Sequence, residues 1–394
     1  MKKLLTFLIL IISLNCISQT YVLANKDTLV ITSTTTTKTG TVTYTYPETV
    51  WTSIVRAYKP PVIVDTIVIP STPTTYQGFG ALAVGGSKST DVRLVSNKAQ
   101  FDAAIGSNRT IKFTANTSFT GRYDLIGITY LTIDANGYDV TIDNAFNGDG
   151  ISFDGATTHH CILTGIRVIN AGNDNINVLD GAHDIVIDHC SVYDSHDGGI
   201  DIAGGAFVTI QYCFIGKGAA DWSGGTLLTA ANVTIYMCLY ALATPGGVGE
   251  RGPLVGSSYG PKGSTPNADI RDNLCWNWGR SNGTGSGFAI DVAYGYNANV
   301  VNNYVKTANS GAVFANGVTT SAYGEPSGGM YAAGNVSGNG INANAKSNHA
   351  EWVIPAQYKV NLLTAIDAAN KVKAGAGTAV KNTYELSVFN SIIL

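Results

Sequence analysis

The chain of 394 residues is poor in charge, since Asp, Glu, Lys and Arg together make up only 13% of it. Hydrophobic residues make up 45%, so disorder fits poorly, because disordered chains combine low hydrophobicity with high net charge. A helical bundle also fits poorly, because the chain holds 45 glycines, which disfavour helix interiors. The formal net charge is -3. A general nucleic-acid-binding function is therefore disfavoured, since such proteins present a net basic face.

Long apolar runs are also scarce. Two lysines precede the apolar stretch Leu4–Leu14, which is too short to span a bilayer. This pattern predicts a signal peptide over residues 1–18 and a secreted protein. Two alternatives stay open, because cleavage could follow Ala24 instead and Cys16 could carry a lipid. No later stretch is long and apolar enough to predict a membrane span.

Residues 19–75 differ from the rest of the chain. They are rich in threonine, they include the alternating run Val42–Tyr46, and they contain the proline pair Pro60-Pro61. Alternation predicts a strand, and the prolines indicate a spacer, so we expect a β-rich N-terminal extension or linker. The functional alternative, a sugar-binding module, has no specific motif to support it. Residues 76–394 are then expected to form a single domain.

That domain repeats itself. Three similar runs end at Cys190, Cys213 and Cys238, and weaker copies end at Asn273 and Asn303. These positions are 23, 25, 35 and 30 residues apart. A period near 23 that lengthens only by insertion predicts a coil of parallel strands from residue 76 to about residue 345, in which equivalent positions stack about 4.8 Å apart. A β-sandwich is the alternative, but it would not explain the regular recurrence.

The repeat also gives the cysteines a role. Cys190, Cys213 and Cys238 would stack in one column as buried thiols, although a disulfide between neighbouring turns of an exported protein stays possible. No paired short-spacing motif supports a cysteine metal site. Cys161 and Cys275 are expected in the core. After the coil, apolar residues at helical spacing predict a packed helix over residues 358–372, and they are Leu362, Leu363, Ile366 and Ala369.

Three acidic residues form the candidate metal site. Asp197 and Asp201 flank two glycines and one isoleucine, and in an extended strand they would lie about 13 Å apart. Gly198 and Gly199 could supply a tight bend that brings the acids together. Asp174 lies 23 residues before Asp197, which is one repeat, so it would sit on the adjacent turn. This arrangement suggests a hard cation such as Ca²⁺, whereas the alternative is a row of solvated turn aspartates.

Several motifs taken in order resemble the polysaccharide lyase family 1 pectate lyases, which are right-handed parallel β-helices. The resemblance covers roughly residues 77–394, and the segments that carry it are Gln77–Gly86, Val186–Ser191, Asp197–Asp201, Arg251–Leu254, Asp269–Asn273 and Trp276–Gly279. It implies an all-β right-handed parallel β-helix with a helical or irregular C-terminal tail. It also implies calcium-assisted β-elimination of polygalacturonate, an acidic polysaccharide, by a protein that we expect to be monomeric.

The resemblance assigns roles to individual residues. Asp174, Asp197 and Asp201 fall where the family places calcium ligands, and Arg251 falls where the family places its Brønsted base. Lys217 lies near the position of the family's substrate-binding lysine. Arg280 is a second candidate substrate-binding cation, which could supply positive charge that the motif lacks, whereas the alternative is a solvated loop residue.

A basic arginine needs a cationic, partly desolvated cleft to lower its pKa, and Arg251 could instead be a surface partner of Glu250. The family often carries arginines three and five positions after the base, where this chain has Leu254 and Gly256. Substrate clamping is therefore expected to be weaker or relocated.

Two other classes of function stay open. A hydrolase of the related β-helix type would need paired catalytic carboxylates, and Asp197 and Asp201 could be that pair. A noncatalytic glycan-binding or adhesion β-helix would need none. Asp188 and His189 match the family's signature, but we interpret them as hydrogen-bonded packing residues, because no nucleophile accompanies them.

Overall fold

The computed structural model describes residues 19–22, 28–31, 76–219, 223–241, 251–258, 266–278, 288–307, 317–320, 325–340 and 342–394. The chain divides into two units, residues 1–74 and 75–394. In the first, β1 (Gln19–Val22) and β2 (Thr28–Ile31) pair antiparallel. The expected signal peptide, Cys16 and the run Val42–Tyr46 lie outside the described residues. No helix in the described ranges has the length and apolar character needed to cross a bilayer.

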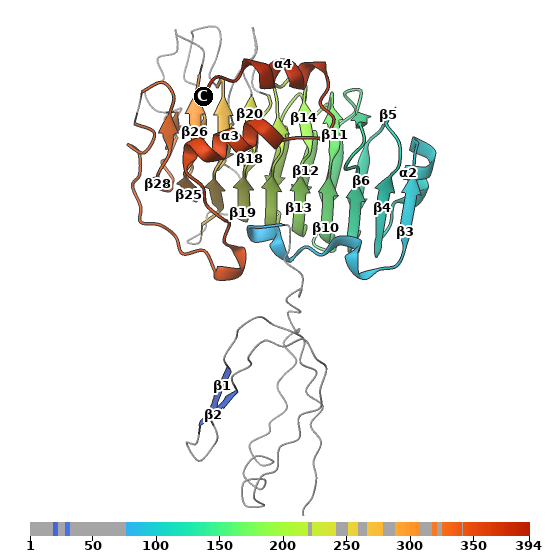
Figure 1. Cartoon of the computed structure of the whole chain (residues 1–394), viewed down its shortest axis with the longest axis horizontal. Helices are drawn as coiled ribbons and strands as arrows, with labels where there is room; N and C mark the ends of the chain where they lie inside the picture. Colours follow the sequence, from blue (N-terminus) through green and yellow to red (C-terminus); the bar gives the residue numbers. More distant parts are fainter. Residues whose placement is uncertain are drawn as a thin grey trace, which may run out of the picture. The chain divides into compact units, whose positions relative to one another are not determined.

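The second unit is built from three parallel sheets (Figure 1). Sheet 1 consists of β6 (Tyr123–Ile126), β9 (Ile151–Asp154), β12 (Ile176–Leu179), β15 (Ile200–Ala203), β18 (Leu227–Leu228), β21 (Leu254–Val255), β24 (Ile290–Val292) and β27 (Val318–Thr319). Sheet 2 consists of β3 (Val92–Val95), β4 (Arg109–Phe113), β7 (Leu131–Asp134), β10 (His159–Thr164), β13 (His183–Asp188), β16 (Ala206–Gln211), β19 (Ala231–Tyr236), β22 (Ala268–Arg271), β25 (Asn297–Val301) and β28 (Gly329–Ala333). Sheet 3 consists of β5 (Thr117–Thr120), β8 (Val140–Asp143), β11 (Ile166–Ile169), β14 (Ser191–Tyr193), β17 (Phe214–Ile215), β20 (Leu239–Ala241), β23 (Leu274–Trp276), β26 (Tyr304–Lys306) and β29 (Val336–Ser337).

From β4 onward successive strands belong to different sheets, so each full turn of the coil adds one strand to every sheet. This confirms the predicted right-handed parallel β-helix. In each strand alternate side chains point inward, where aliphatic residues of adjacent turns stack and exclude water. In sheet 1 one such stack runs through Val178, Ile202, Leu228, Val255 and Val292, all fully buried.

The predicted cysteine column is present. Asp188, Gln211 and Tyr236 are in register on neighbouring strands, and the cysteine two residues after each is fully buried. All five cysteines from residue 161 to residue 275 are free thiols, which removes the disulfide alternative for them. Asparagines continue the column: Asn273 Nδ2 donates to Asn303 Oδ1 and Asn303 Nδ2 donates to Asn335 Oδ1, both at 2.9 Å.

One end of the coil is covered by α2 (Lys98–Ala104) (Figure 1). The Asn97 side chain accepts a hydrogen bond from the Gln100 N–H and so caps the helix. Phe101 is fully buried, and its ring lies 5.2 Å from that of Phe113 and 5.0 Å from that of Tyr123. Two short 3-10 helices, η1 (Phe79–Leu82) and η2 (Gly85–Lys88), precede α2 and pack against sheet 2.

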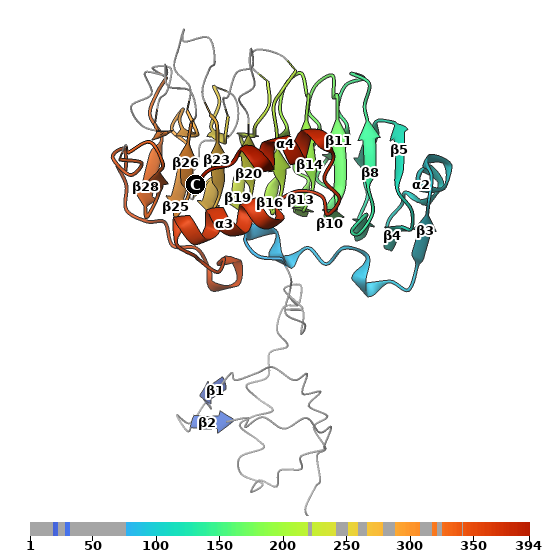
Figure 2. The same cartoon turned by 45° about the horizontal axis from the view of Figure 1, so that its top comes forward.

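The C-terminal tail differs from the prediction. It contains η3 (Ala356–Tyr358), α3 (Ala365–Gly375) and α4 (Thr383–Ser391), and α3 packs on strands of sheet 3 (Figure 2). The expected start of the helix at residue 358 was wrong, because Thr364 accepts a hydrogen bond from the Asp367 N–H and caps the helix there. Leu362 and Ile366 are exposed. The face of α3 that packs is made of smaller residues, namely Ala365, Ala368, Ala369 and Val372.

Candidate metal-binding and catalytic site

The three predicted acids converge on sheet 1. Asp174 lies in the connection that precedes β12, Asp197 lies in the equivalent connection before β15, one turn of the coil later, and Asp201 lies in β15. One carboxylate oxygen from each lies within 4.8 Å of the others, which confirms the predicted convergence. The register differs by one residue from the expected 23, because Ile176 pairs with Ile200. Asp174 is therefore staggered against Asp197 and does not lie directly beside it.

Gly198 allows the close approach of the acids, but not by the mechanism that we expected. Neither Gly198 nor Gly199 adopts a positive φ angle, so the motif contains no left-handed bend. A Cβ atom on Gly198 would instead lie 2.1 Å from Asp201 Oδ1. The Gly198 N–H also donates to Asp174 Oδ1 at 2.7 Å. The glycine is thus required because the Asp201 carboxylate occupies the space of a side chain.

Burial disfavours the charged forms of Asp174 and Asp201. Asp174 is 7% exposed and Asp201 is 5% exposed. Burial raises the pKa of Asp174 to about 7, although the hydrogen bond from Gly198 acts in the other direction. Burial also raises the pKa of Asp201, and the charge of Asp174 raises it further. A bound cation would relieve both effects, because it would compensate charges that neither water nor enough donors reach.

Asn177 adds an oxygen that sequence reasoning missed. It is opposite Asp201 in the register of β12 and β15, and its Nδ2 lies 3.4 Å from Asp174 Oδ2. Its Oδ1 is buried, and no donor among the described residues reaches it. An unpaired buried amide oxygen beside three carboxylates is an all-oxygen set, which suits Ca²⁺. Counting 24 residues per turn would have placed Asn177 in the site.

Arg251 faces the acids, which is where a base that acts beside the calcium ligands would have to lie. It precedes β21, two turns beyond β15, and its Nη1 donates to Asp197 Oδ1 at 2.6 Å and lies 3.9 Å from Asp201 Oδ2. Burial lowers the pKa of the guanidinium, but the charges of Asp201 and Asp197 outweigh it, so the net pKa lies above its ordinary value. While the acids are charged and bear no other cation, Arg251 is therefore their counter-ion and not a base. Glu250 lies outside the described residues.

The two candidate substrate cations are not equally visible. Lys217 Nζ pairs with Asp194 Oδ1 at 3.1 Å and lies 5.6 Å from the centre of the Tyr384 ring. The backbone of Lys217 bridges to Gly224, whose N–H donates to the Asp197 carbonyl. Lys217 is thus near the acidic turn but is held by other partners. Arg280 lies outside the described residues.

Leu254 and Gly256 stand where the resemblance leads us to expect arginines, and the structure treats the two positions differently. Leu254 is only partly buried, and it follows Asp201 and Leu227 in one outward-facing column of sheet 1, so a longer side chain could be accommodated there. Gly256 has a φ angle of 119°, and a Cβ atom there would lie 2.4 Å from the Ala293 carbonyl oxygen. The backbone therefore excludes an arginine at residue 256.

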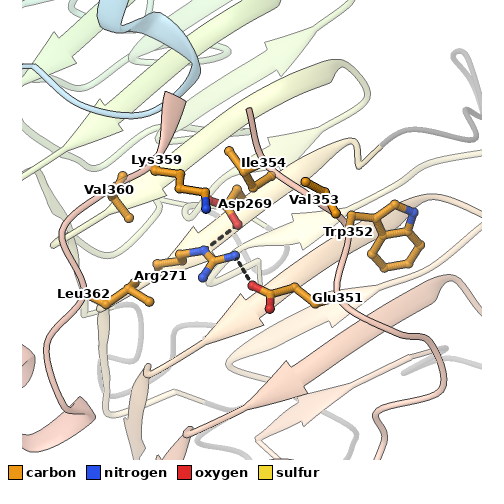
Figure 3. A pocket seen from close by; sticks show the side chains of 9 residues that line it. All are labelled: Asp269, Arg271, Glu351, Trp352, Val353, Ile354, Lys359, Val360 and Leu362. Carbon is orange, nitrogen blue, oxygen red and sulfur yellow. Dashed lines mark hydrogen bonds and ion pairs between the residues drawn. The ribbon is translucent and has the colours of Figure 1, made fainter. Parts of the chain in front are cut away.

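The other motif residues have structural roles. Asp188 Oδ1 accepts from Gln211 at 2.9 Å, and the His189 ring stacks on Tyr212, consistent with our interpretation of packing. Asp269 and Arg271 line a separate pocket of about 270 Å³ beneath the C-terminal tail (Figure 3). There Arg271 bridges Asp269 and the tail residue Glu351, at 2.6 and 2.8 Å.

No protein-family model and no curated protein matches this sequence. The structure, however, is similar to several solved structures, including pectate lyases. Jun a 1, the major allergen from cedar pollen, matches with a TM-score of 0.58 and 16% identity over 77% of this chain and 93% of that chain. A pectate lyase from a Bacillus species in complex with trigalacturonate matches with a TM-score of 0.53 and 20% identity over 78% and 100%. A mutant pectate lyase of Bacillus subtilis gives 0.51 and 16% over 79% and 98%. The fold is therefore the pectate lyase-like parallel β-helix.

Proposed function

We propose that this protein is a secreted polysaccharide lyase of family 1 that cleaves polygalacturonate by β-elimination. The observation that carries the proposal is the convergence of Asp174, Asp197 and Asp201 with Arg251 on one face of sheet 1. The fold shared with pectate lyases supports it, and one of the similar structures holds trigalacturonate.

In this proposal Asp174, Asp197, Asp201 and Asn177 would hold Ca²⁺ through carboxylate and amide oxygens. When bound, the ion would hold the uronate carboxylate and increase the acidity of the neighbouring C5 proton. Its charge would also offset the carboxylates that raise the pKa of Arg251. In its neutral form, Arg251 could then accept the C5 proton on a guanidine nitrogen while the C4–C5 double bond forms and the C4–O bond to the leaving sugar breaks. Solvent water would protonate the leaving oxygen.

The test is an ultraviolet absorbance assay for unsaturated products from polygalacturonate, with Ca²⁺ and with chelator. We expect activity only with Ca²⁺. Asp201→Asn should abolish it without unfolding the protein. Arg251→Lys should lose most turnover and keep substrate binding, because lysine retains the charge but not the geometry or proton affinity of arginine. Asp180→Asn is the matched control, since Asp180 is an exposed turn aspartate at the other end of β12.

Two other outcomes have clear meanings. Saturated reducing ends released without Ca²⁺ would favour a hydrolase that uses the carboxylates as acid and nucleophile. Binding of uronate polymers without any cleavage would favour a glycan-binding or adhesion β-helix, and the lack of arginines at residues 254 and 256 would then be the explanation.

A further inference from the structure

A second group of metal-ligating side chains lies away from the acidic site, on sheet 2. Three of the six histidines in the chain gather where two adjacent strands begin. His159 and His160 open β10, and His183 and Asp184 open β13. We call these four residues the histidine cluster. The reaction proposed above uses none of them.

The backbone explains why four side chains face the same way. His159 pairs directly with His183 in the parallel register of β10 and β13. His160 and Asp184 have φ angles of 56° and 53°, and this left-handed conformation interrupts the alternation of a strand. Two consecutive residues of each strand are therefore only partly buried, whereas the next one, Cys161 or Ile185, is fully buried in the core.

The side chains contact one another in a chain. The Nδ1 atoms of His159 and His160 lie 2.9 Å apart, His160 Nδ1 lies 3.9 Å from Asp184 Oδ2, and His183 Nδ1 lies 2.6 Å from the same oxygen. Two ligands of a tetrahedral zinc ion, bound at 2.0 to 2.1 Å, lie roughly 3.4 Å apart. The observed contacts bracket that value. The part-exposed rings of His159 and His183 stack with their centroids 5.0 Å apart. Among the described residues only the acidic site already brings three ligand atoms within 4.8 Å of one another, so binding an ion here requires these two imidazoles to rotate and turn their nitrogens toward it.

The surroundings leave room for a ligand. Leu82, His183, Asp184, Phe207 and Tyr358 contribute to the wall of an open hollow of about 510 Å³. On the other side, the Tyr130 ring lies 4.9 Å from that of His160.

The electrostatics of the cluster have two opposing parts. Burial lowers the pKa of His159 and of His160, and neutral imidazole is the form that coordinates metals. The charge of Lys88 also lowers the pKa of His160, whereas the charge of Asp184 raises it.

We propose that His159, His160, His183 and Asp184 bind a divalent transition metal of the zinc class. Imidazole nitrogens with one carboxylate suit Zn²⁺, Cu²⁺ or Ni²⁺, whereas the all-oxygen acidic site suits Ca²⁺. The ligands come from two successive turns of the coil, so the ion would join those turns across sheet 2. The site does not depend on lyase activity.

Isothermal titration of Zn²⁺ into the untagged full chain tests the proposal. The protein is first freed of metal with chelator, and excess Ca²⁺ is kept in the buffer to occupy the acidic site. We expect one equivalent of zinc to bind, and His160→Gln and His183→Gln each to weaken binding at least tenfold, because each removes a ligand. Co²⁺ in place of Zn²⁺ should give a visible absorption spectrum that both variants lose.

His189→Gln is the matched control. His189 also hydrogen-bonds the aspartate before it, at 2.9 Å, but it stacks on Tyr212 and has no second histidine beside it. This variant should bind zinc as the parent does, and so should Asp201→Asn. Absence of zinc binding by the parent would overturn the proposal. Equal loss in His189→Gln, or undiminished binding in both cluster variants with unchanged melting temperatures, would also overturn it.

Discussion

Single buried residues hold the tail and the turns in place, and Asp272 is one of them. Its Oδ2 accepts a hydrogen bond from the Leu363 N–H at 2.8 Å, at the start of the segment that leads into α3. Its Oδ1 is buried and has no partner among the described residues. Burial raises the pKa of this carboxyl to about 7. The folded protein thus favours the protonated form of Asp272.

This shift predicts how stability depends on pH. Between about pH 4 and pH 7 the unfolded chain has lost the Asp272 proton while the folded chain still binds it, so the free energy of unfolding falls as pH rises. Below pH 4 both states are protonated and the contribution is complete. Urea denaturation in the presence of chelator measures the free energy of unfolding at each pH. For Asp272→Asn this free energy should fall less steeply as pH rises than it does for the parent. An unchanged slope would show that Asp272 is not its source, since Asp174 and Asp201 act in the same direction.

The cysteine column predicts thiols that do not react in the folded protein. Cys190 and Cys213 are fully buried, and burial raises the pKa of both thiols well above the ordinary value. Because the thiolate is the reactive form, an aromatic disulfide reagent should label none of the five cysteines from residue 161 to residue 275 in native protein. It should label all five in urea. Rapid labelling of Cys213 without denaturant would contradict the buried column.

The three acids of the acidic site could be predicted from the sequence, whereas the residues that contact them could not. Two acids around Gly-Gly and a third one repeat earlier predicted the convergence of Asp174, Asp197 and Asp201. Asn177 was missed because the repeat was counted as 23 residues, and one residue changes which side chains face each other on adjacent strands. Arg251 itself has a left-handed backbone, with a φ angle of 59°. Its pairing with Asp197 depends on this conformation, which the spacing of residues does not reveal.

At the scale of elements, α4 is tied to the coil by a buried ion pair. Arg167 of β11 donates from Nη2 to Glu385 Oε2 of α4 at 2.6 Å, and the two side chains are 2% and 0% exposed. Glu385 also accepts from the Asn382 N–H and completes a capping box at the start of α4. Removing the Glu385 charge would leave the buried Arg167 with only the more exposed Asp139 as its counter-ion.

We therefore expect Glu385→Gln to lower the free energy of unfolding by about 3 kcal/mol, the lower end of the cost of breaking a buried pair, because Asp139 still compensates part of the Arg167 charge. Urea denaturation measures this change. Glu351→Gln is the matched control, since Glu351 also joins the tail to a strand arginine but is 46% exposed. Exposed pairs contribute less than about 1 kcal/mol. Similar losses in the two variants would mean that burial does not decide the contribution.

The tail also shows where periodicity misleads. Leu362, Leu363 and Ile366 have helical spacing, but the helix begins at Ala365, since the Thr364 cap competes with continuation toward the N-terminus. Small alanines form the buried face because they let α3 lie close to sheet 3. A pattern of large apolar residues finds no such face. The helix α4 was not foreseen individually, although a helical or irregular tail was.

At the scale of the whole molecule, stability is carried by contacts between neighbouring turns, as in other solenoids. The end that is covered by α2 is therefore energetically separate from the acidic site. Phe101 fills the end of the core with its ring against Phe113 and Tyr123.

Phe101→Ala should destabilise the capped end by about 3 to 4 kcal/mol, the usual cost of truncating a buried phenylalanine. Native-state hydrogen exchange should show lost protection in β3, β4 and β5, while β15 and β18 stay protected. Leu94→Ala on the exposed face of β3 is the control and should change little, since Leu94 is 64% exposed. Uniform loss along the sheets would instead indicate one cooperative unit.

The architecture as a whole was predictable because parallel coils repeat their sequence as they repeat their structure. Cys190, Cys213 and Cys238, followed by Asn273 and Asn303, recur in the sequence and stack as one column in the structure. Insertions between repeats changed the spacing but not the pairing of the strands on either side of them, since Tyr236 pairs with Arg271 and Arg271 with Val301. The register within a turn could not be derived in this way, because it depends on where left-handed residues interrupt the strands.

The pairing of His159 with His183 and of Ile176 with Ile200 has a mechanical consequence. Both ion-binding groups proposed here straddle one seam, between the turn that starts at residue 159 and the turn that starts at residue 183. One group lies on sheet 2 and the other on sheet 1, so ions in both would fasten the seam from two sides. A chain peeled from either end by force should then come to rest at this seam, and the force needed to pass it should rise with each ion added.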